Sequence, residues 1–511
     1  MSSEENQPEL YRLFNPRSVA VVGATNNINK VGGQVISNLK NGWFPGKIFP
    51  INPKYDLILG KKAYPSIKKV PEQLDVVVSV IPNTHTIPII EECMDAAVKF
   101  VIIITAGFQE TQKFDPIAAQ LTKDLKACVK KAKGITRMVG PNCMGITSTF
   151  SNLNAMMGFL SLAKSNEKFN VSVTSQSGTW TWNVVSFANS HSIGIANGIS
   201  NGNEIDLTIE DFIEYFGFHD EHTDAILGFV EGFRNARKLK RIAPEISEKK
   251  PIIILKGGKT KSGATSASSH TGSIAGNYTI FKSFCYQNGI IEADNSSDLI
   301  DLARAIRLLH PNNYPQGKKV GIFTGGGGAA VILSDIVEKN GMELGVLQDS
   351  TINQLNKILP PHWPHRNPID GVGSNDVWLS LNKLLRIIAS DENIDIILPN
   401  LFFLGFREDV PDQFKKLAKD TFGATEFKKE FLIEFDRQTA NGVIKISKRA
   451  NKLIMVASDH YNALLEDEYE ILTMLFEKGI LVVPSPEVGC KILRKIFTYK
   501  KFLDKRKSLK D

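Results

Sequence analysis

The stretch SVAVVGATNNINKVGGQVISNLKNG (18–42) decides how the N-terminal part of the chain folds. Its first residues, 18–22, form a short β-branched run, which is typical of a strand buried on both faces of a parallel sheet. Gly23 ends this run, and the residues from 31 onward have apolar side chains at helical spacing until Gly42. A strand, a turn and a helix in this order predict one unit of an α/β sheet.

The same alternation of strand and helix patterns continues toward the C-terminus. Further strand patterns follow the first one, a second series begins at 170, and a third begins at 320 after a segment rich in Pro, Asn and Lys. Apolar strands joined by amphipathic helices indicate parallel sheets covered on both sides. We therefore predict an α/β fold of three consecutive Rossmann-like or flavodoxin-like parallel-sheet domains, at residues 1–157, 165–307 and 317–498, followed by a basic tail at 499–511.

The composition is that of an ordinary globular protein. The 511 residues include 61 Lys and Arg against 54 Asp and Glu, and this net charge of +7 allows anionic ligands without indicating a nucleic-acid partner. The five cysteines lie far apart, so we expect neither a disulfide framework nor a zinc site. The N-terminus is polar and acidic, unlike a signal peptide, and no apolar run approaches the ~18 residues of a membrane span. We expect a cytoplasmic protein with no membrane segment.

The turn after Gly23 can bind phosphate, because backbone N–H groups at the start of a helix attract anions. The dinucleotide pattern GxGxxG is nevertheless absent, since Thr25 and Ile28 occupy its second and third glycine positions. The next strand ends at Asn52 and Pro53, without the carboxylate that holds an adenine ribose. This pattern favours a phosphorylated, nucleotide-like ligand over NAD, and a turn with only a structural role is the alternative.

Three later turns are rich in glycine and hydroxyl side chains. The segment GGKT (257–260) is not a P-loop, because Ile253 stands where that motif needs its first glycine, and we expect a flexible loop at 259–269. SQSGT (175–179) follows a strand and starts a helix, which suits a dianionic phosphate, although a simple N-cap explains it equally well. TGGGG (324–328) has the same placement, and four consecutive glycines point to a ligand or a close backbone approach.

His270 and Glu231 are candidates for a chemical step. His270 lies in SASSHTGSIAG (266–276), which we expect to be a loop of small residues before a helix. A neutral imidazole can accept a phosphoryl group, and a surface-loop histidine is the alternative. Glu231 follows an apolar strand in FVEGF, so its carboxylate can point into a ligand crevice and orient an imidazole. A carboxylate at a helix start is the alternative for Glu231.

Two histidine pairs with HxxH spacing offer fragments of a metal site. One pair is His219 with His222, and the other is His362 with His365. No third ligand is evident near either pair, so we predict polar turns and no metal.

Several segments, in order along nearly the whole chain, resemble one family. They are LFNPRSVAVVGAT, ITAGFQE, VGPNCMGI, SQSGT, FVEGF, KPIIILKGGKTKSGATSASSHTGSIAG, VGIFTGGGG and LPPHWPHRNPID. On these segments the chain resembles the α subunit of an NDP-forming acyl-CoA synthetase, of the ADP-forming acetyl-CoA synthetase type, which is related to succinyl-CoA synthetase. The SHTG segment and its spacing from FVEG are specific, whereas the glycine turns are much less so.

The resemblance implies one CoA-binding domain, two CoA-ligase domains and an acid–thiol ligase activity. Acyl-CoA, phosphate and ADP would convert reversibly into free acid, CoA and ATP through an acyl phosphate and a phosphohistidine. It implies that His270 carries the phosphoryl group and that Glu231 orients this histidine. The residues that it implies for phosphate binding are Ser175, Ser177, Gly178 and Thr179. The residues that it implies for CoA binding are Gly23, Ala24, Thr25, Lys54, Ile81, Pro82, Thr105, Ala106 and Gly107.

The resemblance also implies partners. The family binds ADP or ATP, with Mg²⁺, in an ATP-grasp domain, and too few residues follow the third predicted domain to form one. We therefore expect a separate ATP-grasp β subunit in an α2β2 assembly, with a small carboxylic acid or its acyl-CoA as substrate. A non-catalytic CoA-binding or acyl-CoA-binding regulatory protein is the alternative, and the missing motif disfavours an NAD-dependent oxidoreductase.

The chain departs from the family pattern in three places. TGGGG replaces a TNAGG-like turn, the bulky Trp180 and Trp182 follow the phosphate turn, and the segment 398–431 matches poorly. These departures leave the acyl group of the substrate open.

Overall fold

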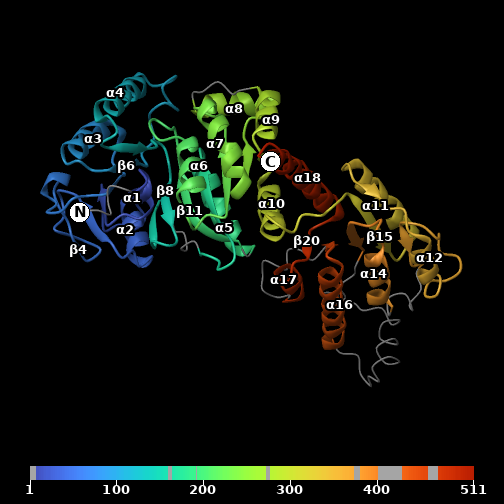
Figure 1. The fold of residues 1–511 in the computed structure, drawn as a ribbon. Coiled ribbons are helices and arrows are strands. Elements are labelled where there is room, and N and C mark those ends of the chain that lie inside the picture. The colour runs from blue at the N-terminus through green and yellow to red at the C-terminus, as the bar shows by residue number, and fades with distance from the viewer. Residues whose placement is uncertain are drawn as a thin grey trace. The chain divides into compact units, whose positions relative to one another are not determined.

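The computed structural model describes residues 7–158, 164–191, 193–271, 277–372, 380–400, 429–458 and 470–510. The chain divides into two compact units, of which the first is Met1–Ala303 with Lys501–Asp511 and the second is Arg304–Lys500. The described residues of the first unit form two large sheets and a small hairpin, and those of the second form one large sheet (Figure 1). The prediction of three parallel-sheet α/β layers is confirmed.

The first sheet has the strand order β2-β1-β5-β6-β7, and each neighbouring pair is parallel. Its strands are filled with Val, Ile and Phe because both faces are buried. The strands are β1 (Ser18–Val22), β2 (Lys47–Ile51), β5 (Val76–Ser79), β6 (Phe100–Ile103) and β7 (Arg137–Val139). The remaining elements here are α1 (Tyr11–Phe14), α2 (Val31–Asn41), α3 (Thr86–Asp95), α4 (Pro116–Ala132), the hairpin β3 (Leu57–Ile58) with β4 (Lys61–Lys62), and the 3₁₀ turns Ile67–Lys69 and Asn83–His85.

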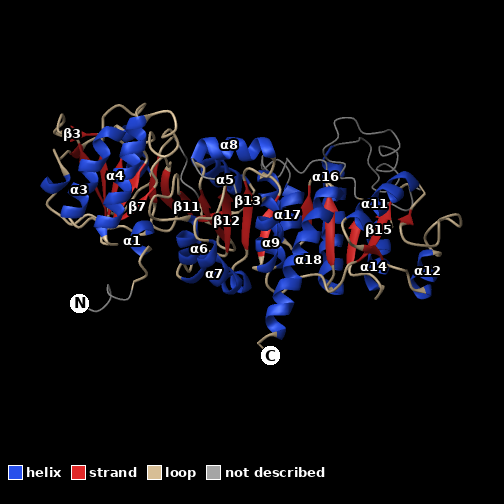
Figure 2. Cartoon of the chain, turned by 90° about the horizontal axis from the view of Figure 1, so that it is seen from above, coloured by secondary structure: helices blue, strands red, loops and turns tan. Residues whose placement is uncertain are grey.

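The second sheet has the order β14-β13-β12-β10-β11-β8-β9. Its strands are β8 (Gly145–Ser148), β9 (Leu153–Met156), β10 (Asn170–Ser175), β11 (Gly194–Ser200), β12 (Ala225–Val230), β13 (Ile252–Lys256) and β14 (Ile290–Ala293). Its helices are α5 (Gly178–Ser190), α6 (Ile209–Phe218), α7 (Ala236–Lys249), α8 (Lys261–Thr271), α9 (Tyr278–Gln287) and α10 (Ser296–Leu309). Figure 2 shows α6 and α7 on one side of these strands and α5 on the other.

The third sheet has the order β16-β15-β18-β19-β20, with β17 paired to β15. Its strands are β15 (Lys319–Thr324), β16 (Glu343–Leu344), β17 (Ile369–Asp370), β18 (Ile396–Pro399), β19 (Leu453–Ala457) and β20 (Leu481–Val483). Its helices are α11 (Gly327–Lys339), α12 (Asp349–Leu355), α14 (Leu381–Ser390), α16 (Lys429–Ala450), α17 (Glu470–Glu477) and α18 (Pro486–Ser508).

All three sheets share one order for their main parallel strands. Counted along the chain within each sheet, the five strands are arranged 2-1-3-4-5. The second strand is therefore added on one side of the first strand and the third strand on the other side. Such a change in the direction of winding leaves a crevice at the carboxyl ends of the first and third strands. In the first two sheets these ends are followed by the predicted turns at Gly23, Ile81, Ser175 and Glu231.

The strands β8 and β9 lie inside the predicted first domain, 1–157, but they extend the second sheet. β8 pairs antiparallel with β11, and β9 pairs antiparallel with β8. Each strand has only four residues, so its apolar pattern says little about which sheet it joins. The division of the chain into domains stays a prediction.

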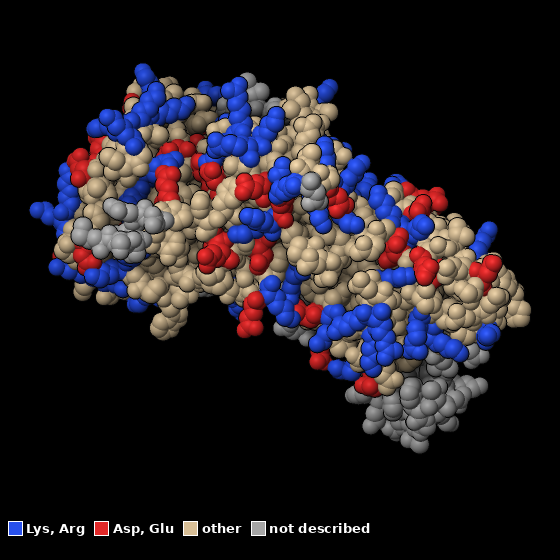
Figure 3. All heavy atoms as spheres, viewed as in Figure 1, with Lys and Arg blue, Asp and Glu red and all other residues tan. Residues whose placement is uncertain are grey.

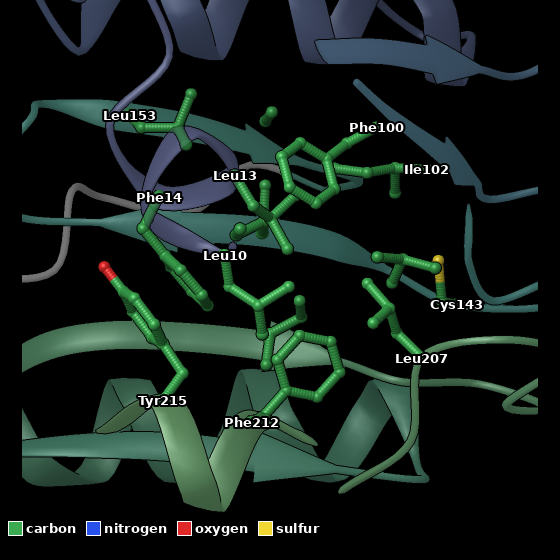
Figure 4. Packing of buried hydrophobic residues seen from close by; sticks show 14 of the residues in the cluster. Leu10, Leu13, Phe14, Phe100, Ile102, Cys143, Leu153, Leu207, Phe212 and Tyr215 are labelled. Carbon is green, nitrogen blue, oxygen red and sulfur yellow. The ribbon is translucent and has the colours of Figure 1, made fainter. Parts of the chain in front are cut away.

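One hydrophobic core connects the two sheets of the first unit. Figure 4 shows Phe14 of α1 beside Tyr215 and Phe212 of α6. The rings of Phe14 and Tyr215 stack with centroids 5.2 Å apart. Arg137, at the start of β7, adds two hydrogen bonds to the Asp206 carboxylate, at 2.9 and 3.0 Å. These contacts hold the crevices of the two sheets within a single compact unit.

The surface carries both signs of charge. On the face drawn in Figure 3, Lys and Arg side chains are interspersed with Asp and Glu side chains. The predicted basic tail includes the end of α18, where Arg506 Nε lies 2.5 Å from Glu248 Oε1. Within the described part of the chain, we find no helix with the length and apolar character that crossing a bilayer requires.

Candidate active site

The turn between β10 and α5 is the first part of the candidate site. Ser175 ends the buried strand, and its Oγ accepts a hydrogen bond from the N–H of Ser177 at 3.0 Å. Ser177 caps α5, since its Oγ accepts from the N–H of Trp180 at 3.4 Å. Gly178 leaves room for the Met144 side chain, because a Cβ here would lie 2.4 Å from Met144 Cγ. The positive end of the α5 dipole and the N–H groups of the helix start suit an anion.

The turn after β12 lies against this first turn. β10 and β12 are parallel neighbours, so Ser175 and Glu231 both follow strand ends at the same edge of the sheet. The N–H of Glu231 donates to Gln176 Oε1 at 2.6 Å, and Gln176 Nε2 donates to the carbonyl of Gly232 at 2.8 Å. The structure therefore joins the predicted phosphate turn and the predicted carboxylate through a residue that the sequence analysis did not single out.

A buried carboxylate supports this junction. Glu204 Oε2 accepts from Gln176 Nε2 at 2.7 Å and from Arg234 Nε at 3.3 Å. Its Oε1 accepts from Asn201 Nδ2 at 3.1 Å and from the N–H of Ile209 at 2.9 Å. Burial and then the neighbouring Glu210 carboxylate raise the pKa of Glu204 to about 7, although Arg234 and the amide donors oppose this rise.

The strand ends of the first sheet form a second cluster. Thr105 Oγ1 donates to the carbonyl of Ile81 at 2.6 Å, which ties the ends of β5 and β6 together. The N–H of Gly107 donates to Glu110 Oε1 at 2.6 Å, and Asn203 Nδ2 donates to Glu110 Oε2 at 2.5 Å. Glu110 thus links the loop after β6 to the segment that carries Glu204.

A pocket of about 570 Å³ lies between these two clusters. From the first sheet, the predicted CoA residues Ile81, Pro82, Thr105 and Ala106 line it. From the second, the predicted phosphate residues Ser177, Gly178 and Thr179 line it, together with Gln176. The pocket therefore brings together two predicted sites that lie roughly a hundred residues apart in the chain. A volume of this size lies in the range of small-molecule binding pockets.

Other predicted CoA residues lie outside the lining of this pocket. Gly23, with φ of +90°, follows the end of β1, and α2 begins only at Val31, so the helix start does not directly follow the turn. The carbonyl of Ala24 accepts from Asn52 Nδ2 at 2.8 Å, and Lys54 is exposed after β2. Gly23, Ala24 and Lys54 follow the carboxyl ends of strands in the first sheet. The remaining predicted CoA residues, Thr25 and Gly107, also follow strand ends at this edge.

The comparisons with known proteins identify the family. A model described as a CoA binding domain matches residues 17–149, and one described as a succinyl-CoA ligase like flavodoxin domain matches residues 168–306. Over 390 residues the chain is 36% identical to the α subunit of ADP-forming acetate–CoA ligase II of Pyrococcus furiosus, covering 76% of this chain and 81% of that one. The chain belongs to the ADP-forming acyl-CoA synthetase family.

Two further relatives of this acyl-CoA synthetase chain are informative. The ADP-forming acetate–CoA ligase I of Archaeoglobus fulgidus is 35% identical over 387 residues, which are 76% of this chain but only 54% of that protein. The solved structure of Candidatus Korarchaeum cryptofilum acetyl-coenzyme A synthetase 1, in complex with phosphate and ADP, has a TM-score of 0.75 at 29% identity. The match to that structure covers 97% of this chain and 98% of the other.

His270 lies on helix α8 of this acyl-CoA synthetase chain. The expectation of a loop is wrong for residues 261–271, which are helical, while residues 272–276 lie outside the described residues. α8 begins five residues after the end of β13, the parallel neighbour of β12. His270 and Glu231 are thus carried by segments that follow adjacent strand ends. The side chain of His270 is outside the description, so its pairing with Glu231 stays a prediction.

A lysine that the sequence analysis missed lies beside Glu231. Lys256 ends β13 and is buried, and its Nζ donates to the carbonyl of Glu231 at 2.7 Å. Burial lowers the pKa of Lys256, and the charge of Glu231 opposes this effect. A cation here stabilises negative charge at the strand ends. The only sequence signal was its place at the end of a strand.

Two departures from the family pattern, Trp180 and Trp182, lie on α5 just after the predicted phosphate turn. Trp180 Nε1 donates to Ser296 Oγ at 3.2 Å, and its ring lies 5.2 Å from that of Phe229. Trp182 is 38% exposed on the same helix. The poorly matching segment 398–431 falls mostly outside the described residues.

One histidine of each HxxH pair packs against an aromatic ring. The ring of His222 stacks on Phe150 with centroids 3.7 Å apart, and His365 lies 4.8 Å from the ring of Trp363. Among the residues that the structure describes, no three His, Cys, Asp or Glu side chains gather as a metal site would require.

Proposed function

We propose that this chain is the α subunit of an ADP-forming acyl-CoA synthetase, which interconverts acyl-CoA, ADP and phosphate with carboxylic acid, CoA and ATP. The observation that carries the proposal is the pocket that joins the strand ends of the CoA binding domain to the helix start of α5. Family membership supports it, because the relatives are named as ADP-forming acetate–CoA ligases and their α subunits.

In the first step, phosphate attacks the thioester of acyl-CoA. The turns at Ile81 and Thr105 would hold the thioester end of acyl-CoA, and the start of α5 would hold phosphate at Gly178 and Thr179. A phosphate oxygen forms a bond to the acyl carbon, the C–S bond breaks, and CoA leaves as a thiolate that is then protonated. The helix dipole and its N–H groups position the phosphate and offset its charge.

In the second step, a nitrogen of His270 attacks the phosphorus of the acyl phosphate, and the free carboxylate leaves. Glu231 would accept a hydrogen bond from the other ring nitrogen, which fixes the tautomer and stabilises the cationic phosphohistidine. The phosphoryl group then passes from His270 to ADP. His270 and Glu231 are the proposed catalytic residues.

The finer features of the assembly belong to this proposal. Nucleotide and Mg²⁺ would bind on a separate ATP-grasp β subunit in an α2β2 complex, and Mg²⁺ would offset phosphate charge there. The substrate would be a small carboxylic acid in the cytoplasm. The names of the related α subunits support a partner subunit.

The experiment is the transfer of label from radioactive phosphate to His270 in the complex with the β subunit. With acyl-CoA present, we expect acid-labile, base-stable label that is lost in His270→Ala. The matched control is His219→Ala, because His219 is exposed at the end of α6, which leads to the opposite edge of the same sheet. Label that survives in His270→Ala contradicts the proposal. CoA binding without any label in the intact complex favours the non-catalytic regulatory protein.

A further inference from the structure

Gln176 occupies an unusual place in the second sheet. It lies between Ser175 and Ser177 in the phosphate turn, yet its side chain points to the turn after β12. The residue is only 7% exposed, and its amide makes hydrogen bonds at both ends. Its Oε1 accepts from the N–H of Glu231 at 2.6 Å and from the N–H of Gly232 at 3.4 Å.

The orientation of this amide is set by its surroundings. Nε2 donates to Glu204 Oε2 at 2.7 Å and to the carbonyl of Gly232 at 2.8 Å. A flipped amide would place its NH₂ group against the N–H of Glu231 and its oxygen against two acceptors. The hydrogen bonds at both ends of the amide would be lost, and leaving such buried groups without partners costs about 1–3 kcal/mol for each group.

Glu204 is itself fixed in place. Its side chain is fully buried and its backbone has φ of +54°, a region that is costly for a residue other than glycine. Two donors approach each of its oxygens, and Arg234 supplies the nearest positive charge. Glu204 lies outside the lining of the pocket, yet it has a strained backbone and four hydrogen bonds. This arrangement indicates that Glu204 holds neighbouring residues in place.

We propose that Gln176 is a positioning residue that holds the turn of Glu231, and that Glu204 with Arg234 fixes the orientation of its amide. The proposal rests on the proposed function for the catalytic role of Glu231. It adds Gln176, Glu204 and Arg234, to which that function assigns no role. One side chain then couples the two turns that the phosphoryl transfer needs. Phosphate at α5 and the carboxylate at β12 keep one relative position because Gln176 belongs to the first turn and binds the second.

The first test is Gln176→Glu, which keeps the shape and the Oε1 acceptor of the side chain. Above the pKa of the new carboxyl, its second oxygen faces Glu204 Oε2 and the carbonyl of Gly232 without a proton to donate. We expect the rate of His270 phosphorylation in the complex to fall by about 100-fold, the size typical of a misplaced catalytic group. The loss should shrink as the pH is lowered, because the protonated carboxyl donates again.

The second test exchanges the partners. In Glu204→Gln, the new NH₂ group faces donors in either orientation, so the rate should fall at every pH. The double variant Gln176→Glu with Glu204→Gln restores a donor between the two side chains and should recover part of the rate at high pH. The control is Gln120→Ala, since Gln120 is exposed on α4 and bonds only Asp124 in the described structure.

Two readouts separate this proposal from the proposed function. Hydrogen exchange at the amides of Glu231 and Gly232 does not depend on catalysis, and it should be faster in Gln176→Ala than in the unaltered complex. Labelling of His270 in the unaltered complex, in contrast, tests the proposed function alone. Unchanged exchange, or a rate loss that neither acid nor the double variant relieves, overturns the positioning role. Absence of label on His270 in the unaltered complex overturns the proposed function. Gln176 would then still hold the turn of Glu231, but this turn would have no catalytic role.

Discussion

The β10–α5 turn and the β15–α11 turn occupy equivalent places in two sheets with the same strand order. In the first of them, Ser175 Oγ accepts from the N–H two residues later at 3.0 Å, and the helix begins at the third residue. In the second, Thr324 Oγ1 accepts from the N–H of Gly326 at 3.4 Å, and α11 begins at Gly327. A hydroxyl at the strand end thus shapes both turns in the same way.

The two turns differ in what surrounds this hydroxyl. The β10–α5 turn has a serine cap, a buried glutamine and the Glu204 network, so side chains hold its conformation. The β15–α11 turn has Gly326 as its cap, with no side-chain hydrogen bond, and a Cβ at Gly328 would meet no atom within 4 Å. Asp370 Oδ2 would lie 3.3 Å from a Cβ at Gly327, so a carboxylate already stands at this helix start. Side chains therefore hold this backbone geometry in one sheet, whereas the same geometry is left open in the other.

The largest expected effect is a pH dependence of stability that Glu204 introduces beside the β10–α5 turn. Its pKa rises from 4.5 to about 7 on folding, so the folded protein keeps the proton over a range where the unfolded chain has lost it. Stability should therefore fall as the pH rises from about 4.5 to about 7, by on the order of 3 kcal/mol. The groups that face Glu204 are Glu210, Arg234, Asn201 and Gln176.

The measurement is thermal unfolding between pH 5 and pH 8, monitored by calorimetry. Glu204→Gln should be less stable at low pH, because its amide meets donors, but its stability should change less with pH than that of the unaltered chain. Asp370→Asn is the comparison at the other turn. Equal pH slopes in the unaltered chain and in Glu204→Gln would show that Glu204 titrates as an ordinary carboxyl.

The second expected effect distinguishes the glycines of the two turns. Gly178→Ala places a Cβ 2.4 Å from Met144 Cγ and should destabilise the first unit by about 1–3 kcal/mol, as overpacking does. Gly328→Ala adds a methyl group to open space within α11 and should stabilise the second unit by about 0.4–1 kcal/mol. Melting temperatures of the two variants should move in opposite directions. A fall of similar size in both would mean that Gly328 is also confined.

The strands and the positions of these turns could be predicted from the sequence, because a buried parallel strand and a glycine-rich turn leave local patterns. The runs SVAVV and IIILK are such strands, and SQSGT and TGGGG follow two others. The pocket between Ile81 and Gly178 could be predicted only in part. The sequence indicates the residues at the strand ends, but the pocket also depends on how two sheets pack around Phe14 and α6.

The side chains that hold the two turns of the candidate site together could not be predicted from the sequence. Gln176 stands inside the segment SQSGT, where nothing in the sequence distinguishes it, and Glu204 lies in NGNEID with no pattern around it. Their contact depends on two turns that meet in space. α8 was expected to be a loop because small and polar residues leave little helical periodicity. The pairing of β8 and β9 with the second sheet could not be predicted either, because strands of four residues carry too little pattern to indicate their partner.

A smaller effect concerns the hydroxyl that both turns share. Ser175→Ala removes the acceptor of the Ser177 N–H and should cost about 1 kcal/mol, the net value of a hydrogen bond in a protein. Thr324→Val should cost less, because its bond to the N–H of Gly326 is longer, at 3.4 Å. The test is hydrogen exchange at the amides of residues 177 and 326 in each variant. A larger change at residue 326 than at residue 177 would contradict this ranking.

The smallest effect comes from exchanging the caps themselves. Gly326→Ser gives α11 the cap that Ser177 gives α5, and the extended backbone at this position, with φ of −168° and ψ of 146°, accepts a serine without strain. Serine is better than glycine at a helix cap by only a few tenths of a kcal/mol, so the melting temperature of the second unit should rise slightly. Ser177→Gly should lower that of the first unit by a similar amount, but it should lower His270 labelling further, because the cap also holds the helix start at which phosphate is proposed to bind. If both exchanges leave stability and labelling untouched, the cap does not distinguish the two turns, and the Gln176 network alone accounts for their difference.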